Sequence, residues 1–115
     1  MAMPLPEIIK KLKLAVRAAR DELNRTVSGG YASDLLSDVM GHSKKNDLWI
    51  TLQVHPNIVA VAVLKELAAI IIVNGREPAA ETIKQAEKEK VPILVSELGT
   101  FELVGRLYEL GIRGG

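Results

Sequence analysis

Hydrophobic and polar positions follow two alternating patterns along the second half of the chain. The short apolar runs predict strands at 48–54, 68–73 and 92–96. The segments between and after them have helical spacing and predict helices at 55–66, 79–90 and 100–111. Since strands that alternate with helices are typical of right-handed crossovers, we expect an α/β fold. Its three layers would hold a mostly parallel sheet of about four to five strands, with helices on both faces.

The first half of the chain is less regular. A short helix is predicted over about 6–12, after a proline. Residues 12–19 alternate between apolar and other positions, which favours a strand, although their alanines also fit one continuous helix to about residue 22. A helix is expected over 33–40, capped by Ser33 or Asp34. Its apolar face would consist of Leu35, Leu36, Val39 and Met40.

Composition indicates one folded domain spanning 1–115. The 115 residues are 48% hydrophobic and 25% charged, which is ordinary for a globular protein. A formal net charge of +1 does not suggest a nucleic-acid partner. The absence of cysteine excludes disulfides and thiolate metal sites, and the two histidines stand in no ligand cluster, so neither a metal nor a cofactor is predicted. The longest apolar runs are too short to cross a bilayer, and we expect no membrane partner and a cytoplasmic protein.

Polar residues and glycines gather in three loops that follow predicted strands. Ligands of open parallel sheets bind at the carboxyl ends of strands, so we expect the loops at 25–30, 53–57 and 74–76 to converge on one edge. The free N–H groups of helix starts there favour an anion. The candidate ligand-binding residues are Arg25, Thr26, Gly29, Gly30, Asp34, Gln53, His55, Asn57, Asn74, Gly75 and Arg76.

Each loop also has a simpler interpretation. Gly29-Gly30 would let an anion approach the backbone beside Arg25, or would form a tight turn whose arginine neutralises Asp34 or Asp38. His55 would bind a ligand through a neutral imidazole, or would cap the next helix.

Two other groups allow two interpretations in the same way. Arg76 would face a ligand, or would pair with Glu77 or Glu81. Asp34 and Asp38 would be an acid–base pair on one helix face, or, as we favour, would complement the helix start and face water.

The predicted helix from residue 57 onward is apolar on all sides up to Leu64. A helix of this kind must be covered on more than one side. We therefore expect a homodimer, with this helix or Trp49 near the interface.

The chain resembles the DRTGG domain, which is related to the N-terminal domain of HPr kinase/phosphorylase. The resemblance rests on NRT at 24–26, GG at 29–30, YASDLLSDVM at 31–40, DLWIT at 47–51, AIIIVNGR at 69–76 and FEL at 101–103. It implies an α/β fold, a strand at 13–19, and a role in regulation or oligomerisation beside catalytic or CBS domains. Asn24 stands where the family name has aspartate, and the P-loop of the kinase domain has no counterpart here, so the resemblance implies no kinase activity.

These observations predict a regulatory or ligand-sensing domain without catalytic activity. It would be homodimeric and would bind an anionic small molecule such as a nucleotide. The alternative is an adaptor that docks on a separately encoded enzyme and has no small ligand. A small enzyme using His55 with Asp34 or Asp38 is disfavoured, because the sequence shows no signature of a nucleophile, metal or cofactor site.

Overall fold

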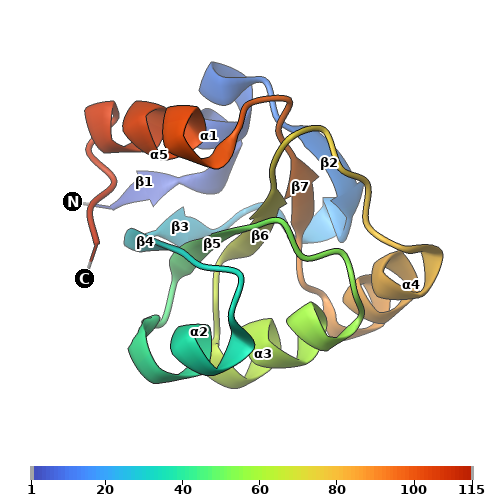
Figure 1. Ribbon diagram of the computed structural model, residues 1–115. Coiled ribbons are helices and arrows are strands. Elements are labelled where there is room, and N and C mark those ends of the chain that lie inside the picture. The colour runs from blue at the N-terminus through green and yellow to red at the C-terminus, as the bar shows by residue number, and fades with distance from the viewer. Residues whose placement is uncertain (1, 115) are drawn as a thin grey trace.

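The computed structural model describes residues 2–114 and contains a five-stranded sheet in the order β2-β7-β6-β5-β4 (Figure 1). Its strands are β2 (Ala15–Ala18), β4 (Gly29–Ala32), β5 (Asp47–Thr51), β6 (Ala69–Ile72) and β7 (Ile93–Val95). The last four are parallel, and β2 pairs antiparallel with β7. A separate antiparallel pair is formed by β1 (Met3–Pro4) and β3 (Thr26–Val27). The mostly parallel sheet is as predicted.

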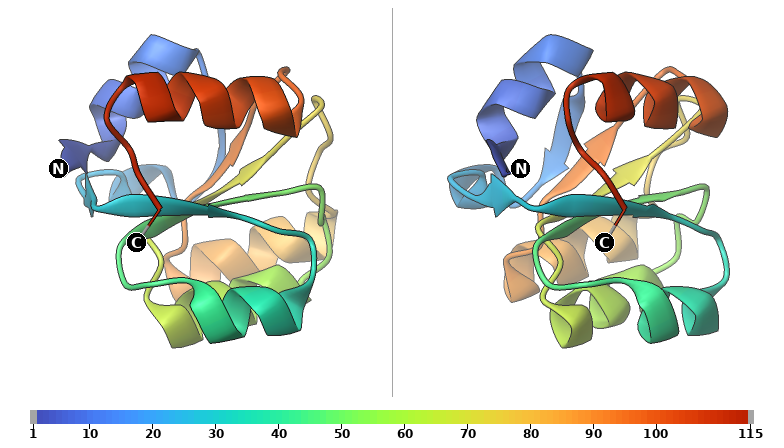
Figure 2. Two further views of the ribbon diagram at one scale, coloured as in Figure 1. Left: turned by 60° about the vertical axis from the view of Figure 1, so that its left-hand side comes forward. Right: turned by 90° about the vertical axis from the view of Figure 1, so that its left-hand side faces the viewer.

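Helices cover both faces of this sheet. They are α1 (Leu5–Leu12), α2 (Leu36–His42), α3 (Asn57–Lys65), α4 (Ala80–Glu89) and α5 (Thr100–Glu109), with a single 3₁₀ turn, η1 (Arg20–Glu22). The first and last helices, α1 and α5, lie on one face, whereas α2, α3 and α4 lie on the other (Figure 2). The predicted three-layer α/β architecture is therefore confirmed.

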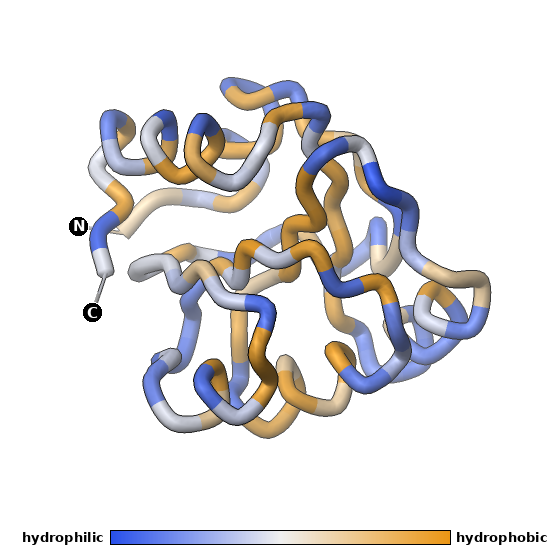
Figure 3. Tube along the Cα trace, viewed as in Figure 1, coloured by the Kyte–Doolittle hydropathy of each residue, from blue (hydrophilic) through white to orange (hydrophobic). Residues whose placement is uncertain are grey.

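The central strands are buried on both faces, which explains why their sequences are continuously apolar. Leu48, Ile50 and Ile71 point to the layer with α1 and α5, and Trp49 and Ile70 point to the layer with α2 to α4. Figure 3 shows this as hydrophobic stretches along the sheet, with hydrophilic residues gathered on the outer turns of the helices.

Residues 12–19 do not continue the first helix. Lys13 adopts a left-handed conformation with φ 54° and ends α1. The following segment pairs with β7, placing Ala15 opposite Val95 and Val16 opposite Leu94. The strand prediction is confirmed and the continuous helix is wrong, because pairing with β7 outweighs the helical propensity of the alanines.

The predicted start of the helix at 33–40 differs from the structure, whereas the last helix begins at residue 100 as expected. The helix α2 begins at Leu36, with Leu35 as its N-cap, and not at residue 33. Ser33 Oγ accepts from the N–H of Leu35 over 3.2 Å but lies outside the helix. Only Val39 of the predicted apolar face is fully buried, because the short α2 covers just the margin of the sheet. Thr100 is the first residue of α5, and Gly99 is its N-cap.

The apolar helix α3 is covered mainly by its own chain. It lies between α2 and α4 and buries Ile58, Val59, Val61 and Ala62, so most of its apolar surface needs no second subunit. Leu64 remains 69% exposed. Trp49 is 0% exposed and donates Nε1–H to the carbonyl of Ser33 over 2.8 Å, so of the two features offered for a dimer interface, Trp49 is not at the surface.

Candidate functional site

The carboxyl ends of the four parallel strands lie at one edge of the sheet, the carboxyl edge. The loops at 33–35, 52–56, 73–79 and 96–99 leave the sheet there. The chain turns to α4 on one face after β6, but to α5 on the other face after β7 (Figure 2). A divergence of this kind between neighbouring strands marks the switch point where open α/β sheets bind ligands.

The predicted site residues are divided between opposite edges. The carboxyl edge holds Asp34, Gln53, His55, Asn57, Asn74, Gly75 and Arg76. The other edge, where the parallel strands begin, holds Arg25, Thr26, Gly29 and Gly30. Convergence of the three loops is therefore wrong for 25–30. The chain crosses the whole sheet between β2 and β4, and it starts β4 beside the first residue of β5.

Arg25 is engaged by backbone carbonyls of its own chain. Its Nε donates to Glu22 O over 2.9 Å, Nη1 to Ala68 O over 3.4 Å and Nη2 to Lys90 O over 2.5 Å. Ala68 directly precedes β6, and Lys90 follows α4. The guanidinium therefore ties together segments that lie at the start of the sheet, and it neutralises neither Asp34 nor Asp38.

The glycine pair lies in a strand and not in a turn. Gly29 and Gly30 begin β4, and neither has a positive φ. A Cβ on Gly29 would lie 2.7 Å from Arg113 O and 2.8 Å from Asp47 Oδ1. Gly30 N–H donates to the same Arg113 carbonyl over 3.2 Å. The close backbone approach that the sequence predicts does occur, but the approaching group is the chain's own C-terminal segment.

Asp34 and Gln53 hold neighbouring loops of the carboxyl edge together. Asp34 Oδ1 accepts from Thr51 Oγ1 over 2.8 Å and from Leu52 N over 2.7 Å. Gln53 Nε2 donates to Asp34 O over 2.8 Å. These bonds occupy two side chains that the sequence offered as ligand-binding candidates, and they fix the loop after β4 to the loop after β5.

The turn after β6 lies at the switch point. Asn74 and Gly75 have φ of 60° and 63°, and Arg76 N–H donates to Val73 O, which makes a type I′ turn. Asn74 N donates to Leu98 O over 2.9 Å, and Gly75 N to Ser96 O over 2.8 Å. The predicted turn with positive φ is confirmed, and its backbone is bound to the loop after β7.

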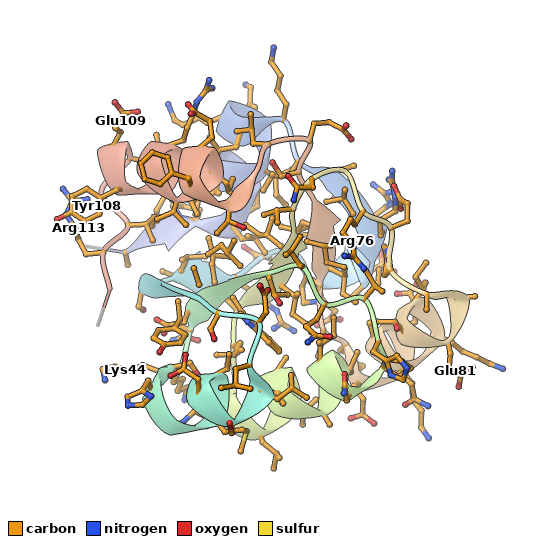
Figure 4. All side chains as sticks on the ribbon, in the orientation of Figure 1. Lys44, Arg76, Glu81, Tyr108, Glu109 and Arg113 are labelled. Atoms are coloured by element: carbon orange, nitrogen blue, oxygen red, sulfur yellow. The ribbon has the colours of Figure 1, made fainter. Side chains whose placement is uncertain are left out.

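Four polar side chains of this edge stay exposed. Those of His55, Asn57, Asn74 and Arg76 make no hydrogen bond or ion pair within residues 2–114. The guanidinium of Arg76 extends over the strand ends, away from Glu81 on α4 (Figure 4). The other candidate partner of Arg76, Glu77, is bound to Arg17.

Glu77 pairs with Arg17 of β2 instead of with Arg76. Arg17 Nε and Nη2 donate to the two carboxylate oxygens over 2.6 and 3.0 Å, a bidentate pair. This pairing raises the pKa of Arg17 and lowers the pKa of Glu77. Arg76 is therefore left as an exposed cation beside the switch point, while the carboxylate of Glu97 lies against Gly75 of the same turn.

A side-chain cluster between β4 and α2 was not predicted. Tyr31 Oη donates to Asp38 Oδ2 over 2.8 Å, and His42 Nδ1 lies 3.1 Å from Asp38 Oδ1. The spacing of Asp38 and His42 by one helical turn was the signal available in the sequence. Because Asp38 is bound here and Asp34 is bound to Thr51, neither carboxylate forms a hydrogen bond with His55, and the disfavoured catalytic pair is not assembled.

The Tyr31 hydroxyl is the main cause that lowers the pKa of Asp38, with smaller effects from Ser33 and His42. A lowered folded-state pKa stabilises the fold above the ordinary value of 3.8, and this stabilisation is lost as the pH falls through the folded value. We therefore expect Asp38→Asn to lower the melting temperature near pH 7, with a difference from wild type that narrows below pH 4. Thermal melts across pH test this.

Tyr31→Phe removes the same hydrogen bond from the other side and should show the same trend. Tyr108→Phe is the matched control, since the Tyr108 hydroxyl donates to no carboxylate in the described part of the chain. A difference between Asp38→Asn and wild type that is constant across pH would contradict the assigned cause.

Two surface hollows lie away from the exposed cation. A groove of about 500 Å³ between α3 and α4 has an apolar floor and the acidic residues Glu81 and Glu89 on its wall. A hollow of about 360 Å³ at the opposite edge of the sheet contains Arg25, Thr26 and Lys45. No group of three or more potential metal ligands occurs within 2–114, and no helix in that range is long and apolar enough to span a membrane.

Comparisons with known proteins place this geometry in a family. The chain is similar to the structure described as the CBS and DRTGG domains of the regulatory region of Clostridium perfringens pyrophosphatase, complexed with the activator diadenosine tetraphosphate, with a TM-score of 0.66. The two are 14% identical, and the match covers 88% of this chain and 44% of that one, so it shows a shared fold. A comparison with curated proteins gave no match. The family model for the DRTGG domain matches residues 7–110, and the chain therefore belongs to the DRTGG domain family.

Proposed function

We propose that this chain is a non-catalytic regulatory domain that senses an anionic small molecule, such as a nucleotide, and acts as a homodimer. Membership in the DRTGG family supports the regulatory role. The structurally similar region belongs to a pyrophosphatase regulatory region in complex with a nucleotide activator, which supports a ligand of that class. This chain spans less than half of that one, so the activity of a larger protein is not transferred.

The observation that carries the ligand proposal is the unpaired guanidinium of Arg76 at the switch point. Asn74 adds an uncharged hydrogen-bonding side chain on the same turn, and His55 adds another on the loop after β5, at the same edge of the sheet. The two loops are joined, because Val54 O accepts from Ala79 N over 3.1 Å and from Thr82 Oγ1 over 2.6 Å. A phosphate bound by Arg76 would therefore meet groups that are already held in place.

The adaptor function remains the second candidate, and one observation favours it. The outer face of α5 exposes Phe101 and Tyr108, which form the kind of apolar surface that a protein partner covers. The two candidates differ in what they predict for a ligand screen of the isolated chain, because only the first requires direct binding of a small molecule.

Thermal-shift measurements with ATP, AMP, diadenosine tetraphosphate and inorganic phosphate test the ligand proposal. A nucleotide at about a hundred times its Kd should stabilise the fold by about 2.7 kcal/mol. Arg76→Ala should abolish the shift while leaving the melting temperature of the free chain almost unchanged, since its side chain supports no other group.

Lys45→Ala is the matched control, because Lys45 is an exposed cation in the hollow at the opposite edge. Loss of the shift in Lys45→Ala and not in Arg76→Ala would move the site to that edge. The absence of a shift with every nucleotide would reject ligand sensing and leave the adaptor function.

A further inference from the structure

The outer face of α5 carries an aromatic stripe that the described chain leaves uncovered. Phe101 is 91% exposed and Tyr108 is 56% exposed, one at each end of the helix. Val104 and Gly105 lie between them on the same side, since residues three, four and seven positions apart share a helical face. The opposite face buries Leu103 and Leu107 against the sheet, so the helix is fixed in this orientation.

The surface around Phe101 is hollowed on both sides. A hollow of about 480 Å³ is lined by Ala32, Thr100, Phe101, Val104, Gly105 and Tyr108, nearly all through apolar atoms. A second hollow, of about 280 Å³, lies on the other flank beside Glu102, Arg106 and Glu109. Gly105 borders both, and a methyl group placed on it would meet no atom within 4 Å. The protruding ring and the space that would receive such a ring thus occur on one helix.

We infer that the outer face of α5 is the interface with a second copy of this chain, packed antiparallel about Gly105. This inference rests on the homodimer proposed above and assigns its surface. The stripe is nearly symmetric about residues 104–105, so a two-fold axis there places Phe101 of each copy beside Tyr108 of the other. An isologous contact of this kind needs a patch that is complementary to itself.

Two of the three charges on the flank with Glu109, those of Glu102 and Arg106, have the same self-complementarity. Within one copy, Glu102 and Arg106 lie one helical turn apart, with 4.0 Å between Arg106 Nε and Glu102 Oε2. The two-fold axis places this flank of both copies on the same side of the helix pair. The residues of the two flanks then run in opposite directions. Glu102 of each copy then lies close to Arg106 of the other. Because this flank carries both acidic and basic side chains, a partner of one charge sign would be repelled by part of it, which favours a second copy over a basic or acidic peptide.

Within residues 2–114, the segment that follows α5 does not cover the stripe. The C-terminal segment turns away to β4, where Arg113 O accepts from Gly30 N. On the way, the Arg113 guanidinium stacks on the Tyr108 ring, 3.7 Å from its centroid, which orients that ring at the end of α5 (Figure 4). One face of the Tyr108 ring is thus covered by Arg113 of the same chain, whereas the Phe101 ring is 91% exposed.

Sedimentation velocity on the full chain, with protein concentration as the variable, tests the inference. Wild type should be dimeric, and Phe101→Ser should raise the dimer Kd by about thirtyfold or more, as expected for a central aromatic residue. Gly105→Lys should do the same by filling the contact, without losing fold stability, because the position is open and a glycine inside a helix is replaced favourably. Circular dichroism melts check that both variants fold.

Matched variants test the position of the interface separately from the existence of the homodimer. Leu64→Ser on α3 removes another exposed apolar side chain, one that is 69% exposed, and should leave the dimer intact. Glu102→Arg alone should weaken the dimer, and addition of Arg106→Glu should restore it. A dimer that dissociates in Leu64→Ser but not in Phe101→Ser overturns the α5 interface while the homodimer stands, and a wild-type monomer throughout overturns both.

Discussion

Gly29→Ala is expected to lower the free energy of unfolding by about 2 kcal/mol, the usual cost of forcing an extra group into filled space. The new methyl group would meet Arg113 O and Asp47 Oδ1 at less than 3 Å. Asp47 cannot move aside easily, because it is buried and its Oδ2 accepts from Lys44 N over 2.8 Å. The C-terminal segment would then be displaced from β4, with loss of the bond from Gly30.

Urea denaturation followed by circular dichroism measures this effect. Gly41→Ala is the matched control, because Gly41 lies in α2 with no atom near its missing Cβ, and the change should stabilise the chain by up to about 1 kcal/mol. Equal stability of Gly29→Ala and wild type would mean that the C-terminal segment does not pack against β4 in solution.

Arg25→Ala should also cost about 2 kcal/mol of stability, since hydrogen bonds to a charged group are among the stronger ones and their loss leaves acceptors without donors. The carbonyls of Ala68 and Lys90 would lose the guanidinium that joins them. Arg25→Lys should recover only part of the loss, because one ammonium group cannot reproduce the fork of donors. Denaturant titration of both variants gives the measurement.

The same variants distinguish a structural role of Arg25 from a role in ligand binding. If it supports the fold, Arg25→Ala should lower stability and leave nucleotide binding at Arg76 intact under conditions where the variant is folded. A variant with wild-type stability that no longer binds any nucleotide would return Arg25 to the ligand site, as the sequence analysis first predicted.

These expectations change the interpretation of the segment that carries the family resemblance. In the structure, the residues from Arg25 to Gly30 bind backbone and the C-terminal segment of the same chain. Four exposed polar side chains remain for a ligand at the carboxyl edge: those of Arg76 and Asn74 on the turn after β6, and those of His55 and Asn57 after β5. We therefore propose the ligand site at the carboxyl edge and regard the glycine pair as a packing feature.

Local patterns in the sequence were sufficient for the elements of the second half of the chain and for the sheet's class, but not for β4, whose two glycines were expected in a loop. The continuously apolar run at β6 and the helical spacing of α4 depend on neighbours within a few residues, and both elements were predicted at almost their observed bounds. The positive φ of Asn74 and Gly75 was likewise predictable, because a turn of this type depends on the two residues themselves.

Only the tertiary structure decided which loops meet. The partners of Gly29 and Arg25 lie far away in the sequence, on the C-terminal segment and at the ends of β6 and α4, and no local pattern encodes such pairs. The alternation of strands and helices is the same for several strand orders, so the crossing that carries 25–30 to the opposite edge was not visible in it. That packing also decides which polar side chains form hydrogen bonds within the chain, as Asp34 does, and which stay exposed, as Arg76 does. A side chain's hydrogen-bond partners are set by the neighbours that folding brings to it.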